Sequence, residues 1–166
     1  MVWFMGFLKS YGKAGGQKDI FGQHSDYVMS VQKFMKREYI YLIPFMMRYG
    51  LSRFVRRPLD FSKIDLSRYM IAIDSNQGRL LYNMVLSIKP KVLFEFGLSH
   101  GISALYLGQA LKRLGYGLLY SSEIAQNKID IAKSHIDKVG LTKQIQILEG
   151  DVLETINSII EPIEFV

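Results

Sequence analysis

The stretch VLFEFGLSHGISALYLGQAL, residues 92–111, is the part of the sequence that is most informative about the fold. Its first five residues, 92–96, form a short and mainly apolar run that is typical of a buried parallel strand. A turn with two glycines, Gly97 and Gly101, follows, and residues 102–114 then carry apolar side chains at helical spacing. The stretch therefore predicts a strand, a glycine-rich turn and a helix in direct succession.

The same order continues along the chain. Residues 118–122 and 144–148 are two further apolar runs, and helical periodicity marks residues 129–139 between them and 152–160 after them. The last residues, 163–166, look like the start of a fourth strand. Strands that alternate with helices predict an α/β fold, a Rossmann-like doubly wound parallel sheet with helices on both faces.

The N-terminal part of the chain has a different character. Residues 1–70 carry 12 Lys and Arg against 5 Asp and Glu, whereas residues 71–166 carry 9 against 10. A helical pattern rich in aromatic residues runs over 26–57, interrupted by Pro44 and Gly50. We expect a helical, basic N-terminal region over 1–70 and the α/β domain over 71–166.

Composition excludes several classes of site and protein. The chain has no cysteine, which excludes a disulfide scaffold, a thiolate zinc site and a cysteine nucleophile. Its three histidines are widely separated and show no metal-ligand spacing, so we expect no zinc site. No nucleic-acid-binding motif is present, and the apolar run 39–47 is shorter than the about 20 residues that cross a bilayer. We therefore expect a cytoplasmic protein with no specific nucleic-acid partner.

Residues 39–57 place apolar side chains beside basic ones. Such a segment fits a peripheral contact with a membrane surface, a homodimer interface, or a helical cap that packs on the main domain. The sequence leaves these three interpretations open.

Three carboxylates follow or end the predicted strands: Glu95, Glu123 and Asp151. Ligands of parallel sheets bind at the carboxyl ends of the strands. Glu95, within an apolar strand, needs a partner such as a ligand ammonium or donors in the adjoining turn. Glu123 is placed to accept hydrogen bonds from ribose hydroxyls, and Asp151 to meet an adenine amino group.

Four segments resemble the class I S-adenosylmethionine (SAM)-dependent methyltransferases, and most of all the small-molecule O-methyltransferases of the catechol and caffeoyl-CoA type. VLFEFGLSHGISALYLGQAL is similar to the first motif of that family, and SEIAQNKIDIAKSHIDKVGL (122–141) to the second. IQILEGDVLETI (145–156) is similar to the third, and SNQGRLLYNMVLSIKPK (75–91) to the helix before the first strand. The likeness covers residues 74–166.

The resemblance implies SAM as the cofactor and transfer of its methyl group to an oxygen of a small-molecule acceptor. The residues that it assigns to SAM are Glu95, Gly97, Ser99, Gly101, Ser103, Glu123 and Asp151. Gly97 and Gly101 would admit the methionine part, Ser103 would bind near its carboxylate, and Glu95 would contact its ammonium. Ser99 stands where the general pattern has a glycine. No catalytic residue is assigned.

In the family, a strand like the one at 163–166 leads to an Asp that ligates a divalent metal or faces the substrate, and further strands complete a seven-stranded sheet. Those parts would lie beyond Val166. We therefore expect a fragment or a truncated form that has little activity alone, with no metal ligands among its own residues.

Two alternatives come from other classes of protein. Gly97-Leu98-Ser99-His100-Gly101 matches the G-x-S-x-G turn of α/β-hydrolases, in which Ser99 would be the nucleophile. The triad would then need His135, the one histidine later in the chain, which we interpret as a solvated residue in mid-helix. The second alternative is a non-catalytic binding protein whose N-terminal region recruits a membrane or a partner.

Overall fold

The computed structural model describes residues 20–34 and 72–166. The first segment is helical, with the 3-10 turn η1 (Gly22–His24) followed by a helix over 25–34. The other elements are, in chain order, α4 (Ser75–Ile88), β1 (Val92–Phe96), α5 (Ile102–Leu114), β2 (Leu118–Glu123), α6 (Gln126–Val139), β3 (Ile145–Glu149), α7 (Val152–Thr155) and η4 (Ile156–Ser158). The predicted strand at 92–96 and helix at 102–114 are confirmed residue for residue, and β3 begins one residue later than predicted.

The three strands form a parallel sheet in the order β1-β2-β3. The last residues of the chain return to the free side of β1, where Leu93 pairs with Phe165 in parallel. The N–H of Phe94 donates to the carbonyl of Phe165 at 2.8 Å, and the N–H of Glu164 donates to that of Val92 at 2.9 Å. The predicted fourth strand is thus present as a single bridge, and chain order reverses at β1.

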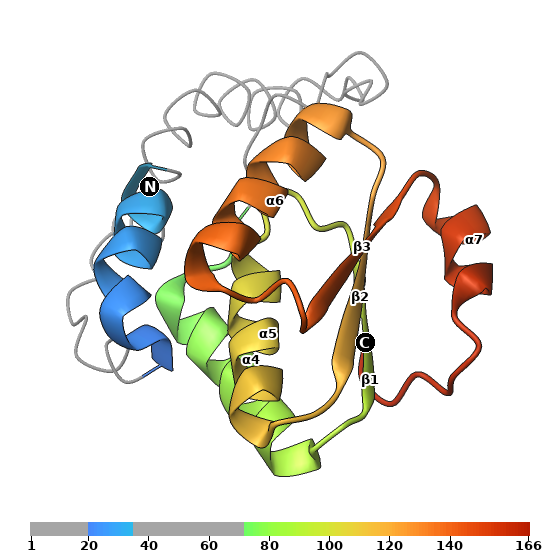
Figure 1. Cartoon of the computed structure of the whole chain (residues 1–166), viewed down its shortest axis with the longest axis horizontal. Helices are drawn as coiled ribbons and strands as arrows, with labels where there is room; N and C mark the ends of the chain where they lie inside the picture. The colour runs from blue at the N-terminus through green and yellow to red at the C-terminus, as the bar shows by residue number, and fades with distance from the viewer. Residues whose placement is uncertain (1–19, 35–71) are drawn as a thin grey trace, which may run out of the picture.

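Helices lie on both faces of this sheet. Figure 1 shows α4, α5 and α6 on one face and the short α7 on the other. The 25–34 helix lies outside α4 and α5 on the first side (Figure 1). The doubly wound arrangement predicted from the sequence is confirmed.

The core is centred on Tyr106 of α5, a side chain with no solvent exposure. Its ring lies in edge contact with Phe21, with 4.9 Å between the ring centres, and its hydroxyl accepts a hydrogen bond from Gln32 at 3.3 Å. Gly78 of α4 faces the same ring so closely that any side-chain carbon there would overlap it. A glycine at this position therefore lets α4 and α5 approach, while Tyr106 joins the N-terminal helix to the sheet-covering layer.

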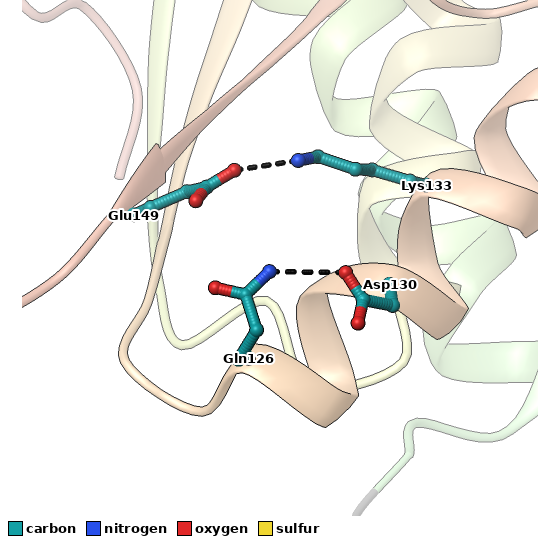
Figure 2. A network of polar contacts seen from close by, with 4 residues as sticks. All are labelled: Gln126, Asp130, Lys133 and Glu149. Atoms are coloured by element: carbon teal, nitrogen blue, oxygen red, sulfur yellow. Dashed lines mark hydrogen bonds and ion pairs between the residues drawn. The ribbon is translucent and has the colours of Figure 1, made fainter.

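A salt bridge connects α6 to the exposed end of β3. Figure 2 shows Lys133 reaching from α6 to Glu149, with 2.5 Å between the ammonium and the carboxylate. One turn earlier, the amide of Gln126 donates to Asp130 at 3.0 Å within the helix (Figure 2). Both pairs are solvent-exposed, so they contribute little to stability.

The helix predicted over 152–160 is wrong in its length. α7 ends at Thr155, η4 tightens the chain over the next three residues, and Ile159 is extended. The side chains of Asn157 and Ser158 donate back to the carbonyls of Leu153 and Thr155, at 3.0 and 2.7 Å. Such local bonds compete with a regular helix.

In the described part of the chain, no helix is long and apolar enough to cross a membrane. The surface contact interpreted for residues 39–57 lies outside the described residues.

Candidate functional site

The carboxyl ends of β1, β2 and β3 meet at one edge of the sheet, as the parallel register requires. β1 lies between β2 on one side and the residues around Phe165 on the other, so the order of the strands along the chain reverses at β1. In open parallel sheets, ligands bind in the crevice outside such a reversal. Two clefts open at this edge, and they share Phe96 and Gly97.

The first cleft has a volume of about 440 Å³ and lies between β1, the following turn and the start of α4. Its polar side chains come from α4, β1, the turn after β1 and α5: Gln77, Glu95, Ser99, His100 and Ser103. Four of the residues predicted from the sequence, Glu95, Gly97, Ser99 and Ser103, therefore lie around one cavity.

Glu95 is the acid of this cleft. Its carboxylate accepts a hydrogen bond from the Ser121 hydroxyl at 2.5 Å and another from the hydroxyl of Ser103. Burial raises its pKa to about 7, and the two hydrogen bonds only partly offset that effect. A cation beside Glu95 would stabilise the ionised form, which makes this position suited to a ligand ammonium.

The glycine turn is held against β2 by backbone bonds. The N–H of Leu98 donates to the Ser122 carbonyl at 2.8 Å, and that of Gly97 reaches the Ser122 hydroxyl at 3.4 Å. Gly97 has a φ of 84°, and no atom lies within 4 Å of where a side-chain carbon would stand. The missing side chain leaves open space at the junction of the two clefts.

Gly101 lies outside both clefts. Its φ is also 84°, and a side-chain carbon there would come within 3.3 Å of Ala132 on α6. The structure thus brings this predicted site residue close to the others in the turn but places it against the core. Its observed contact is helix packing.

Glu123, at the end of β2, joins the two turns. One carboxylate oxygen accepts the N–H of Ser99 at 2.8 Å, and the other accepts those of Ile124 and Ala125 at 3.0 Å each. Ser99 itself has a φ of 49°, a left-handed conformation that is costly for a residue with a side chain. Glu123 therefore stabilises the conformation of the first turn while it faces the second cleft.

The second cleft has a volume of about 240 Å³. It is lined by the end of β1 and by the turns after β2 and β3, including Phe96, Gly97, Glu123 and Asp151. Asp151 also begins α7, because its carboxylate accepts the N–H of Leu153 at 2.8 Å. The two acids predicted at the ends of β2 and β3 thus line the same cavity.

The histidines do not form a hydrolase triad with Ser99. His135 is half-buried, and its Nδ1 lies 2.8 Å from the carbonyl oxygen of His100, so interpreting it as a solvated residue was wrong. The Ser99 hydroxyl instead lies 3.4 Å from Nδ1 of His100, its neighbour in sequence. Burial lowers the pKa of His100 to about 4, so this ring is neutral near pH 7.

Phe96 and Gln77 are among the lining residues of these clefts that were not predicted. Phe96 ends β1 with 71% of its surface exposed, and it lines both cavities. Gln77 reaches the first cleft from α4. The pattern Asp74-x-x-Gln77 at a helix start was a signal for Gln77, because it marks a capping box, but it does not say what the helix faces.

No group of three or more His, Cys, Asp or Glu side chains within residues 20–34 and 72–166 is arranged to hold a metal ion.

A Rossmann-like α/β sheet with acids and a glycine turn at its carboxyl edge defines a class of nucleotide-binding proteins. Comparison with known proteins gives the family: residues 59–165 match the O-methyltransferase family model. The chain belongs to the O-methyltransferase family, as its motifs predicted.

A curated relative is the catechol O-methyltransferase of Niastella koreensis, which is 29% identical over 91 residues. That match covers 55% of this chain and 40% of the relative, so the chain spans well under half of the relative's length.

Solved structures support the fold. The SAH-bound methyltransferase PaMTH1 of Podospora anserina has a TM-score of 0.51 and 20% identity, over 54% of this chain and 38% of its own. The O-methyltransferase TomG of Streptomyces achromogenes, involved in tomaymycin synthesis and in complex with SAM, also has a TM-score of 0.51, with 22% identity over 67% and 44%.

Proposed function

We propose that this chain binds SAM and forms the donor-binding part of an O-methyltransferase that acts on a small-molecule acceptor. The observation that carries the proposal is the joined pair of clefts at the carboxyl edge of the sheet, with a half-buried acid in one and two acids in the other. Membership of the O-methyltransferase family supports it. Within this proposal, residues 71–166 are the SAM-binding domain and residues 1–70 a basic cap.

The two clefts suit the two ends of SAM. In the first cleft, Glu95 would pair with the ammonium of the methionine part, and Ser99 and Ser103 would lie near its carboxylate. The open space beside Gly97 would hold the atoms that connect the two ends. In the second cleft, Glu123 would accept a ribose hydroxyl at its remaining acceptor position, and Asp151 would meet the adenine amino group. Gly101 would act indirectly, by letting α6 support the turn.

Bound SAM supplies a methyl group on a sulfonium, which is a good leaving group. Methyl transfer would form a bond between the acceptor oxygen and the methyl carbon as the carbon–sulfur bond breaks, so that S-adenosylhomocysteine (SAH) leaves and the acceptor's proton passes to water. No role toward the acceptor is proposed for the residues described here. They would hold and orient the donor, the contribution by which positioning lowers the barrier.

Glu123 has a double task in this proposal. Its two oxygens offer about four acceptor positions, of which three are occupied by backbone N–H groups. A ribose would therefore meet a carboxylate that is already oriented by its own turn. The bond from Ser99 is the one that joins the two turns, so ligand binding and the shape of the first turn are coupled through Glu123.

Isothermal titration of the purified chain with SAM and SAH tests the proposal. We expect saturable binding, weakened about tenfold or more in Glu123→Ala, because hydrogen bonds to a charged group are lost. Glu149→Ala is the matched control, since it removes an acid from the end of the neighbouring strand, outside both clefts. Because both oxygens of Glu123 accept backbone N–H groups, the thermal midpoint of ligand-free Glu123→Ala shows how much of the loss comes from local structure.

Heat release that does not saturate, from a wild-type chain whose circular dichroism shows it to be folded, would refute the proposal. Equal affinities for the wild type and Glu123→Ala would leave SAM binding in place and refute the role of Glu123.

A further inference from the structure

The polar side chains that line the first cleft include few that can carry a positive charge. Within the described residues, no lysine or arginine lines it, and the one imidazole, His100, is 5% exposed and neutral near pH 7. The hydroxyl of Ser103 donates to Glu95. A ligand with a carboxylate must therefore find neutral donors here, and besides Ser103 the side chains that offer them are Ser99, Gln77 and the one N–H of the neutral His100 ring.

Gln77 is held in a fixed orientation by the start of α4. Its N–H donates to the carboxylate of Asp74 at 2.9 Å, and its side-chain oxygen accepts the N–H of Asp74, also at 2.9 Å. This reciprocal capping box commits the oxygen end of the amide to the helix. The NH₂ end is then the part of the side chain that can meet a ligand, and its orientation is set before any ligand arrives.

We propose that Gln77 is a specificity-determining residue, whose side-chain NH₂ donates a hydrogen bond to the carboxylate of the amino-acid end of SAM. The inference rests on the proposed function and adds to it a donor on α4, in the same cleft as the acid on β1. Glu95 would pair with the ammonium and Gln77 with the carboxylate, so that the zwitterionic end is read by one charged and one neutral group.

The variant Gln77→Glu isolates this donor. Glutamate occupies the same position of a capping box as glutamine, so the bond to the N–H of Asp74 is kept. The NH₂ group is replaced by a carboxylate oxygen, which cannot donate and repels a ligand carboxylate. We expect an unchanged thermal midpoint for the ligand-free chain and a SAM affinity that falls about tenfold or more.

Two controls make the result specific. Decarboxylated SAM keeps the ammonium, the sulfonium and the nucleoside but lacks the carboxylate, so its affinity should not fall in Gln77→Glu. Asn76→Asp adds the same charge one residue earlier, on an exposed side chain outside the cleft that already accepts a hydrogen bond from Arg79. It should bind SAM as the wild type does.

The outcomes separate the two proposals. A wild-type chain that binds SAM, with Gln77→Glu equal to it or losing affinity for SAM and decarboxylated SAM alike, overturns the role of Gln77 and leaves the proposed function standing. An equal loss in Asn76→Asp would show an effect of charge at the helix start, which also overturns it. A folded wild-type chain that binds no SAM overturns both.

Discussion

Glu95 and His100 are ionisable side chains of one cleft whose burial disfavours the charged form. The pKa of Glu95 is raised to about 7, and that of His100 is lowered to about 4. Their effects on stability have opposite signs. Between pH 4.5 and 7 the folded state binds a proton at Glu95 that the unfolded state has lost, so this group makes the fold less stable as pH rises.

Replacing Glu95 with glutamine should remove that loss. We expect Glu95→Gln to exceed the wild type in free energy of unfolding by about 1–3 kcal/mol at pH 8, with the difference shrinking as pH falls toward 4.5. Urea unfolding at pH 5 and pH 8 measures it. A constant difference at both pH values would contradict the raised pKa.

His100→Gln tests the opposite effect, the lowered pKa of the buried histidine in the same cleft. The unfolded state binds a proton at His100 between pH 6.5 and 4 that the folded state does not, so the wild type loses stability through this group as pH falls through that range. His100→Gln should therefore flatten the acid side of the profile. A profile as steep as that of the wild type would show that another group titrates there.

At the scale of elements, the contact between α4 and α5 depends on a residue without a side chain. Gly78 is buried against the ring of Tyr106, and that ring in turn meets Phe21. α4 carries Gln77 into the first cleft, and α5 begins just after the glycine turn. The distance between α4 and α5 therefore affects both the packing of the core and the width of the first cleft.

Gly78→Ala should force the two helices apart or displace Tyr106. We expect the free energy of unfolding to fall by about 1–3 kcal/mol, the usual cost of overpacking, although alanine favours helices more than glycine does. Asn83→Ala, on the exposed face of the same helix, is the control and should be neutral or slightly stabilising. Chemical denaturation of both variants decides it, and equal stability of Gly78→Ala and the wild type would contradict the packing.

At the scale of the whole molecule, the sheet is extended by a segment that lies far along the chain. The backbone of Glu164 and Phe165 bonds to β1, and the side chain of Glu164 accepts the N–H of Lys91 at 2.5 Å. This pairing puts β1 in the interior of the sheet. It also creates the reversal of strand order beside which both clefts open.

Glu164→Pro removes the N–H that donates to Val92 and the side-chain acceptor of Lys91 together. We expect a loss of about 1–3 kcal/mol in unfolding free energy and faster hydrogen exchange at the amide of Phe94, which bonds to Phe165. Glu164→Gln keeps the backbone donor and a side-chain oxygen, and should stay close to the wild type. Unchanged exchange at Phe94 in the proline variant would contradict the pairing.

Local features of the sequence predict the order of strands and helices and the edge of the sheet that carries the site. Periods of 3.6 residues, glycines after strands and acids at strand ends are local features, and parallel pairing then brings those ends together. That is why Glu95, Glu123 and Asp151 could be placed at one edge before their geometry was known.

The contacts that each site residue makes are visible only in the folded structure. Glu123 holds the turn at Ser99, Ser103 donates to Glu95, Gly101 supports α6, and Gln77 enters the first cleft from α4. These contacts join residues on different elements, and their existence depends on how closely the helices approach the sheet. Periodicity fixes which face of a helix is buried, but packing at positions such as Gly78 fixes that approach, and with it the polar atoms that line the site.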